Sequence, residues 1–169
     1  MNTLNSFEIG ILHSLHDALQ CTFLDTIMPI ITRLANSGIF WIMLALLLLF
    51  FKKTRRAGIT MGIALILGLV FGNLLLKPLI ARVRPYDFDP SIILLIPKEK
   101  DFSFPSGHTL SSVISACVLL HTSAVIGIIA VIMCAFILFS RMYLFVHYPS
   151  DVLGGISLGI IISEIVMMI

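Results

Sequence analysis

The sequence predicts an all-α integral membrane protein, a bundle of about six helices whose N-terminal helix is amphipathic or only partly embedded. Its 169 residues are 59% hydrophobic and only 12% charged, whereas soluble domains average about 25% charged residues. The mean hydropathy is +1.08. Several apolar runs also approach the roughly 20 residues that a helix needs to cross a bilayer. The chain length suits a single membrane domain over residues 1–169.

The N-terminal third is predicted to contain one interfacial helix and two apolar segments. Residues 5–20 place apolar side chains at helical spacing with polar ones between them, a pattern typical of a helix that lies in the membrane interface. Residues 22–35 contain two charges and a proline and are short for a span, so they fit either a broken or a buried helix. Residues 38–51 form the next apolar segment and end at the basic run 52–56, which is a cytoplasmic signal.

The remaining two thirds of the chain alternate between apolar spans and polar connections. Residues 57–76 carry no charge and form the clearest span, and a polar loop follows over about 82–105. Further spans are predicted over 107–121, 124–140 and about 151–168. Following the crossings along this path brings the charged ends of the spans to one face, opposite the basic run 52–56.

The positive-inside rule gives this arrangement an orientation. The chain is predicted to be a multi-pass protein of the cell inner (plasma) membrane, with the charged span ends on the extracytoplasmic face. Five Lys and Arg residues between Lys77 and Lys100 oppose this orientation, unless several of them bind an anion and so do not report topology.

Five residues near the ends of the apolar spans have the chemistry needed to bind a phosphate group. Charges at membrane depth are costly and call for a functional explanation. Lys77 supplies a point charge, whereas Arg84 and Arg141 supply planar guanidinium forks that suit phosphate oxygens. Ser106 and Gly107 precede an apolar helix whose N-terminal N–H groups can meet an anion, and glycine lets the backbone approach closely.

Two histidines and one aspartate supply the groups that phosphoryl transfer needs. His147 and Asp151 are four residues apart, so on a continuous helix they would share a face, although Pro149 leaves the local geometry open. A carboxylate bonded to one imidazole nitrogen fixes the tautomer and raises the basicity of the other. We therefore expect His147 to be the nucleophile and Asp151 to orient it. His108 would protonate the leaving oxygen and later activate water.

Other polar and small residues have simpler explanations. Arg82 lies outside these patterns and is expected to snorkel at a helix end, with assistance to a second phosphate or a lipid headgroup as the alternative. Glycines four apart predict close helix packing at Gly58 and Gly62, Gly68 and Gly72, and Gly155 and Gly159. Internal hydrogen bonds are expected for most of Asp25, Arg33, Asn36, Asn73 and Glu164. The three cysteines show no metal-binding spacing.

Three motifs occur together and in order: Lys77-x6-Arg84-Pro85, Pro105-Ser106-Gly107-His108 and Ser140-Arg141-x5-His147-x3-Asp151. With them the chain resembles the type 2 phosphatidic acid phosphatase superfamily, the membrane lipid phosphate phosphatases. The motif-bearing part covers about 57–168, and the N-terminal part resembles the family only in hydropathy. The resemblance implies a six-helix bundle and a phosphohistidine mechanism that uses neither metal nor cofactor. It carries over the phosphate-binding and catalytic roles expected above.

The same resemblance implies hydrolysis of a lipid mono- or diphosphate. Undecaprenyl diphosphate is the favoured substrate, and phosphatidylglycerophosphate and phosphatidate are alternatives. A lipid phosphotransferase would use the same residues, as would a vanadium-dependent haloperoxidase, although those enzymes are soluble. A small lipid transporter would explain the hydropathy but not the histidines and aspartate at motif spacing. The predicted partners are the lipid substrate and membrane lipids, because a net charge of +2 is too small to suggest nucleic acid; the oligomeric state is left open.

Overall fold

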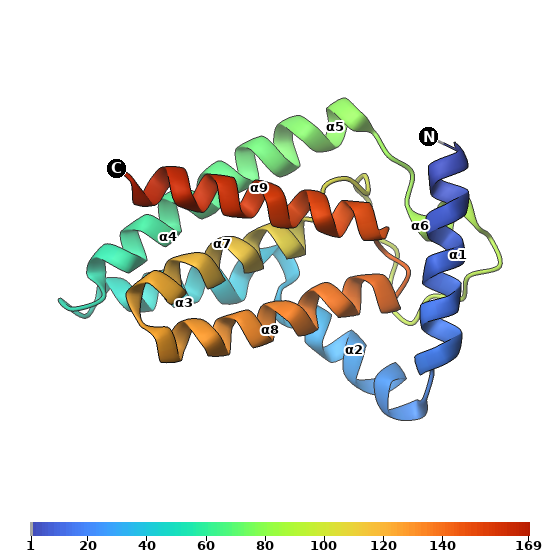
Figure 1. Ribbon diagram of the computed structural model, residues 1–169, viewed down its shortest axis with the longest axis horizontal. Helices are drawn as coiled ribbons and strands as arrows, with labels where there is room; N and C mark the ends of the chain where they lie inside the picture. The colour runs from blue at the N-terminus through green and yellow to red at the C-terminus, as the bar shows by residue number, and fades with distance from the viewer. Residues whose placement is uncertain (1) are drawn as a thin grey trace.

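The computed structural model describes residues 2–169, and the described residues form helices and loops without a strand (Figure 1). The chain begins with α1 (Asn2–Leu19), α2 (Thr22–Leu34), the 3-10 turn η1 (Asn36–Gly38) and α3 (Ile39–Leu49). A second run contains α4 (Arg55–Gly68), the π-helical segment η2 (Leu69–Leu76), α5 (Lys77–Ile80) and the short α6 (Pro85–Phe88). The C-terminal part contains α7 (Gly107–Thr122), α8 (Ala124–Tyr143) and α9 (Pro149–Met167). The predicted all-α class is confirmed.

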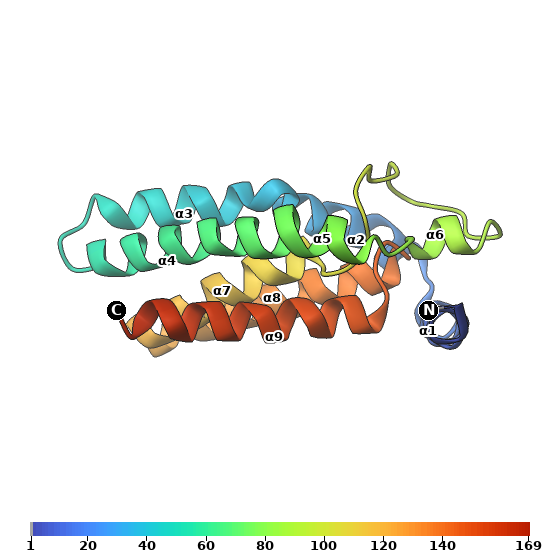
Figure 2. The ribbon, with the colours of Figure 1, turned by 90° about the horizontal axis from the view of Figure 1, so that it is seen from above.

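The rods formed by α2–α3, α4–α5, α7, α8 and α9 run side by side, and α1 lies across one end of them (Figures 1 and 2). Four helical runs among the described residues are long and apolar enough to cross a membrane, namely Thr22–Leu49, Arg55–Phe88, α8 and α9. α7 is shorter and packs against α4, α8 and α9, with nine of its residues buried. The position of α1 across the bundle end agrees with the interfacial helix predicted for residues 5–20.

Of the two alternatives left open for residues 22–35, a broken or a buried helix, the structure shows a break just beyond residue 35. α2 and α3 form one apolar run that is interrupted at η1, where Ser37 (φ 52°) and Gly38 (φ 67°) both adopt left-handed conformations. Glycine takes this conformation without the steric cost of a side chain, so Gly38 favours the turn between the two helices. The break also brings the side chain of Asn36 to α7, where it contacts His108.

Close packing at glycines brings the helices together as predicted, with one exception. A Cβ at Gly58 would lie 2.8 Å from the carbonyl oxygen of Ala45, so α3 and α4 touch through their backbones. A Cβ at Gly155 would lie 2.9 Å from the carbonyl oxygen of Ser106, which shows how closely α9 approaches the start of α7. A Cβ at Gly62 would have no atom within 4 Å, because Gly62 lines a cavity instead of a helix contact.

Candidate active site

The eight residues predicted to form the site lie at the end of the bundle that α1 crosses. They come from the start of α5 (Lys77), the residue before α6 (Arg84), the start of α7 (Ser106, Gly107, His108), the last turn of α8 (Arg141), the α8–α9 loop (His147) and the first turn of α9 (Asp151). The basic run 52–56 joins α3 to α4 at the opposite end (Figure 1). The helical path predicted from the sequence therefore brings these residues to a common face.

Irregular backbone precedes the first group of cations and directs them inward. The π-helical η2 ends immediately before Lys77, and such wider turns often occur at functional sites. Ala81 then adopts a left-handed conformation (φ 48°) that ends α5. Lys77, Arg82 and Arg84 are only 5%, 4% and 2% exposed. This stretch is therefore not a row of surface charges at a helix end.

Two carboxylates from the loop before α7 hold the three predicted phosphate-binding cations together. The Nη2 atom of Arg84 lies 2.6 Å from Glu99 Oε2 and 2.5 Å from Asp101 Oδ1. Arg141 contacts the other oxygen of Glu99, and Lys77 contacts the other oxygen of Asp101. We call this arrangement of Lys77, Arg84, Arg141, Glu99 and Asp101 the cation cluster. Each carboxylate bridges two cations, which is the arrangement that a phosphate group can replace.

The electrostatics of the cluster keep both carboxylates ionised. Burial alone would raise the pKa of the Glu99 carboxyl, but the guanidinium groups of Arg141 and Arg84 outweigh it and lower that pKa to about 2. Burial likewise opposes ionisation of Asp101, and its contacts with Lys77 and Arg84 lower its pKa. Glu99 and Asp101 were missed in the sequence, where they read as part of a mixed-charge loop.

His147 is buried, and its two ring nitrogens face different surroundings. Nε2 lies 3.4 Å from Nη1 of Arg84, toward the cation cluster. Nδ1 lies 3.5 Å from Oδ2 of Asp151, which is longer than an ordinary hydrogen bond. The Ser103 hydroxyl lies 3.5 Å from the same nitrogen and donates to Asp151 Oδ2. Burial, and then the charges of Arg84 and Arg141, lower the pKa of His147 well below its usual value, so the ring is neutral at neutral pH.

His108 contacts the cation cluster from α7. Its Nε2 lies 3.5 Å from Nη1 of Arg141 and 3.0 Å from Oδ1 of Asn36. The internal hydrogen bond expected for Asn36 is thus present, and its partner is a predicted catalytic residue. Arg141 also donates to the Thr32 hydroxyl at 2.6 Å, which fixes the guanidinium against α2.

Ser106 is buried, but its hydroxyl is directed toward its own helix. Ser106 Oγ accepts hydrogen bonds from the backbone N–H and the hydroxyl of Thr109, at 3.4 and 3.0 Å, and so caps α7. Its backbone N–H donates to the carbonyl oxygen of Asp151 at 3.1 Å. The described contacts therefore give Ser106 a structural function, whereas its predicted contact with phosphate stays a prediction.

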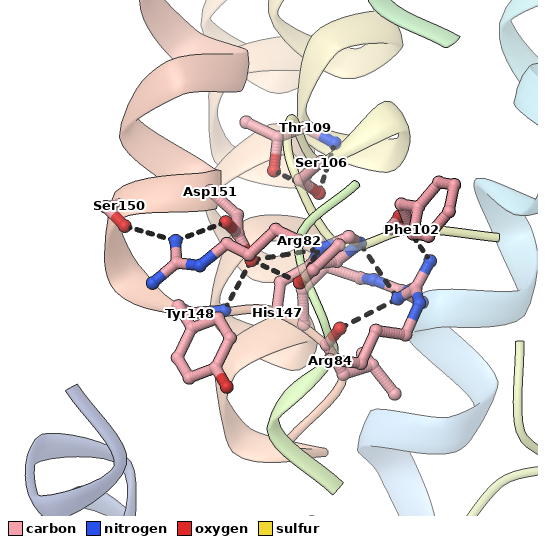
Figure 3. A network of polar contacts seen from close by, with 12 residues as sticks. Arg82, Arg84, Phe102, Ser106, Thr109, His147, Tyr148, Ser150 and Asp151 are labelled. Carbon is pink, nitrogen blue, oxygen red and sulfur yellow. Dashed lines mark hydrogen bonds and ion pairs between the residues drawn. The ribbon is translucent and has the colours of Figure 1, made fainter. Parts of the chain in front are cut away.

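The structure corrects the interpretation of Arg82. Instead of snorkelling, its guanidinium lies inside the protein and donates to Asp151 Oδ1 at 2.6 Å (Figure 3). Figure 3 shows Arg82 on the Asp151 side and Arg84 on the His147 side of the histidine–aspartate pair. Its other buried partners are Asn5 and Glu8 of α1, more than 70 residues away in sequence, so no local pattern around Arg82 indicates them.

A cavity of about 820 Å³ adjoins the cation cluster and extends between α3 and α4. Its polar end contains Lys77, Glu99, Asp101 and His108. Its walls further along are largely apolar and include Ala45, Leu46, Leu49, Gly62, Leu65 and Ile66. The cavity therefore connects charged groups at one end of the bundle with an apolar space between two helices.

Comparison with known proteins places this geometry in a family. Residues 57–169 match the model of the PAP2 superfamily. The undecaprenyl-diphosphatase of Sulfolobus acidocaldarius is 37% identical over 148 residues, which cover 85% of this chain and 69% of that protein. Phosphatidylglycerophosphatase B of Bacillus subtilis is 33% identical over 163 residues, covering 85% and 74% of the two chains.

Two solved structures share the fold over nearly the whole chain. The crystal structure of a transmembrane PAP2-type phosphatidylglycerolphosphate phosphatase from Bacillus subtilis has a TM-score of 0.80 and 28% identity, covering 99% of this chain and 86% of the other. The structure of Aquifex aeolicus LpxE has a TM-score of 0.83 and 28% identity, covering 95% and 94%. Sequence, fold and family match agree, and the chain belongs to the PAP2 superfamily of membrane lipid phosphatases.

Proposed function

We propose that the chain removes the terminal phosphate from a long-chain lipid diphosphate, with undecaprenyl diphosphate as the favoured substrate. One observation carries this proposal, namely that Lys77, Glu99 and Asp101 of the cation cluster line the cavity whose apolar part lies between α3 and α4. A charged headgroup and its hydrocarbon chain can therefore bind in one continuous site. The name of the Sulfolobus acidocaldarius relative supports the choice of a polyprenyl diphosphate.

In the first proposed step, Nε2 of His147 attacks the phosphorus atom that the cations hold. A P–N bond forms, the bond between phosphorus and the leaving oxygen breaks, and His108 donates a proton to that oxygen. His147 suits this role because Nδ1 faces Asp151 while Nε2 faces Arg84. The lipid leaves as a monophosphate, and a phosphohistidine remains on the protein.

In the second proposed step, water releases the phosphate. His108, now neutral, takes a proton from a water molecule whose oxygen attacks phosphorus, and the P–N bond to His147 breaks. Lys77, Arg84 and Arg141 stabilise the charge on the non-bridging oxygens in both steps, with the backbone N–H of Gly107 at the start of α7 as a further donor. Neither step needs a metal or a cofactor.

Substrate binding requires the three cations of the cluster to exchange their carboxylate partners for phosphate oxygens. Glu99 and Asp101 occupy the donors that a phosphate group needs. These two carboxylates must therefore leave Arg84, Arg141 and Lys77 when the substrate enters. Because Glu99 and Asp101 lie in a loop and not in a helix, their movement does not require the bundle to rearrange.

The direct test measures inorganic phosphate released by the detergent-purified protein with a chelator present. Undecaprenyl diphosphate, phosphatidylglycerophosphate and phosphatidate are compared. Phosphatidylglycerophosphate is the second candidate because relatives in sequence and in structure are named for it. We expect the highest kcat/KM for the diphosphate and its loss in His147→Ala. Phosphate release that survives this substitution would refute the phosphohistidine scheme, and release that needs an acceptor lipid would indicate a phosphotransferase.

The proposal also places the site on the extracytoplasmic face of a cell inner (plasma) membrane. The supporting observation is that the basic run 52–56 lies at the opposite end of the bundle. Cys21 is exposed and joins α1 to α2 at the end that contains the site (Figure 1). A membrane-impermeant thiol reagent should therefore label Cys21 in intact spheroplasts. Labelling that requires membrane permeabilisation would reverse the orientation.

A further inference from the structure

We propose that Arg82 is a positioning residue that holds the carboxylate of Asp151 in place for His147, and that α1 anchors Arg82 for this purpose. This inference rests on the proposed roles of His147 and Asp151. The guanidinium of Arg82 lies on the opposite side of Asp151 and His147 from that of Arg84, a member of the cation cluster (Figure 3). It therefore acts through Asp151 and not by contact with the phosphate.

All five N–H donors of the Arg82 guanidinium can be accounted for by buried or half-buried oxygens. Nη1 donates to Asp151 Oδ1 and to the Ser150 hydroxyl, both at 2.6 Å. Nη2 donates to Glu8 Oε2 at 2.5 Å and to Asn5 Oδ1 at 2.8 Å, and Nε donates to the same Asn5 oxygen at 3.1 Å. The guanidinium also stacks over the ring of Tyr148 at 4.0 Å. A fork with five donors fixes its acceptors more tightly than a point charge does.

α1 supplies two of the residues that bind the Arg82 guanidinium, Asn5 and Glu8. Asn5 and Glu8 are 3% and 4% exposed, which is unusual for polar residues of an amphipathic helix. Glu8 also accepts from the Ser150 backbone N–H at 2.7 Å and from its hydroxyl at 2.9 Å. One carboxylate of α1 therefore binds both Arg82 and the first turn of α9, where Asp151 lies.

The remaining contacts of Asp151 explain why Arg82 matters to its orientation. Oδ2 accepts from the Ser103 hydroxyl and from the Tyr148 backbone N–H. Oδ1 accepts from Arg82, and the described contacts give it no second donor. Without Arg82, Oδ1 loses this donor, so the carboxylate can rotate away from Nδ1 of His147. Because small misplacements of catalytic groups slow the chemical step, kcat should fall.

The inference predicts an effect on kcat that is separate from substrate binding. Arg82→Ala would leave Glu8 buried without a counter-charge, so the informative variants are Arg82→Lys and the double variant Arg82→Met/Glu8→Gln, which removes both charges. For the double variant we expect kcat to fall about 100-fold. KM should stay within about twofold because Arg82 does not contact the cation cluster. Arg82→Lys should lie between this variant and the wild type.

A double-mutant cycle separates positioning from general structural support. If Arg82 acts through Asp151, the Arg82 substitutions should lower kcat by less than about threefold when Asp151 is already alanine. The control is His13→Ala, which removes a different polar contact between α1 and the rest of the protein, His13 Nε2 with Asp89 Oδ2 at 2.9 Å. This control should keep kcat within about twofold. Melting temperature in detergent shows that each variant is folded.

Three results would overturn the inference. The first is a folded Arg82→Met/Glu8→Gln variant with nearly wild-type kcat. The second is an equal loss of kcat in the wild-type and Asp151→Ala backgrounds, which would make Arg82 a structural residue only. The third is an equal loss in His13→Ala, which would assign the effect to docking of α1 in general. If Asp151→Ala itself kept wild-type kcat, the proposed role of Asp151 would fail instead.

Discussion

Replacing Glu99 by glutamine should tighten substrate binding, because Glu99 occupies the donors that the phosphate needs. Its carboxylate binds Arg84 at 2.6 Å and also contacts Arg141. The cations lower the pKa of Glu99 from 4.5 to about 2, so at 1.36 kcal/mol per pH unit they favour the ionised form by about 3 kcal/mol. Glutamine keeps the hydrogen-bonding shape but not the charge. We expect about half of this energy to appear as tighter binding, or about tenfold lower KM.

The assay compares KM for the lipid substrate and the inhibition constant of inorganic phosphate, which binds without a hydrocarbon chain. Both should fall together in Glu99→Gln. Asp87→Asn is the matched control, because it makes the same charge change in the neighbouring α6, where Asp87 pairs with Lys98 at 2.6 Å outside the cluster. Unchanged or higher values of both constants in Glu99→Gln would refute the idea that this carboxylate is displaced.

The same substitution should lower the stability of the unliganded protein. A carboxyl group whose pKa is lower in the folded state contributes stability above its unfolded pKa, near 4.5, and loses it as the pH falls toward 2. At pH 7 the full contribution is present in the wild type, so Glu99→Gln should melt at a lower temperature without ligand. Saturating phosphate should raise the melting temperature of this variant more than that of the wild type.

Three further predictions follow from the site and its cavity. Gly62→Leu should lower kcat/KM about tenfold for a long-chain substrate, because the new side chain fills cavity space that about two methylene groups of the lipid would occupy. A short-chain analogue should be hydrolysed normally, and an equal loss for both substrates would show damage to the fold instead. Burial and nearby cations lower the pKa of His147 below 6.5. The acid limb of the kcat/KM profile, corrected for ionisation of the substrate, should therefore have its midpoint below pH 6.5, and a midpoint above that value would contradict a neutral buried nucleophile. Ser103→Ala should lower kcat about tenfold, with little change in KM, by removing a donor to the buried Asp151 carboxylate, and an unchanged kcat would assign no role to this contact.

Local patterns in the sequence were sufficient to predict the long helices and to find the three motifs, but not α6, which lies in the segment expected to be a polar loop. Hydrophobic runs and their charged ends indicate where the long helices lie, so α7 could be predicted as a helix although it is only 16 residues long. The motifs identify Lys77, His108 and His147 because their spacing is fixed by the helix ends that carry them. The three-dimensional contacts among these residues depend on helix packing, which no local pattern contains.

The residues that were missed depend on contacts between distant parts of the chain. Arg82 looks like an anchor at a helix end, and its direction is decided by the left-handed turn at Ala81 and by Glu8, which is 74 residues away in sequence. Glu99 and Asp101 look like solvated loop charges. Only the return of this loop over the bundle end brings them to Arg84, 17 residues before Asp101.

The two carboxylates of the cation cluster, Glu99 and Asp101, also give a physical reason to expect discrimination against phosphodiester lipids. A phosphodiester headgroup carries one charge on two non-bridging oxygens. Displacing both Glu99 and Asp101 removes two negative charges from three cations, and one phosphodiester returns only one. A terminal phosphate carries about −1.5 to −2 charges and three acceptor oxygens at pH 7, so it can restore the balance.

Specificity would then come from competition with the protein's own carboxylates as well as from attraction. Phosphatidylglycerol vesicles or mixed micelles should accordingly inhibit the wild-type protein weakly. They should inhibit the double variant Glu99→Gln/Asp101→Asn at least tenfold more strongly, because the competing charges are gone, and Asp87→Asn should behave as the wild type does. Equal inhibition of all three proteins would show that the carboxylates take no part in excluding phosphodiesters, and discrimination would have to arise at His147 during the chemical step.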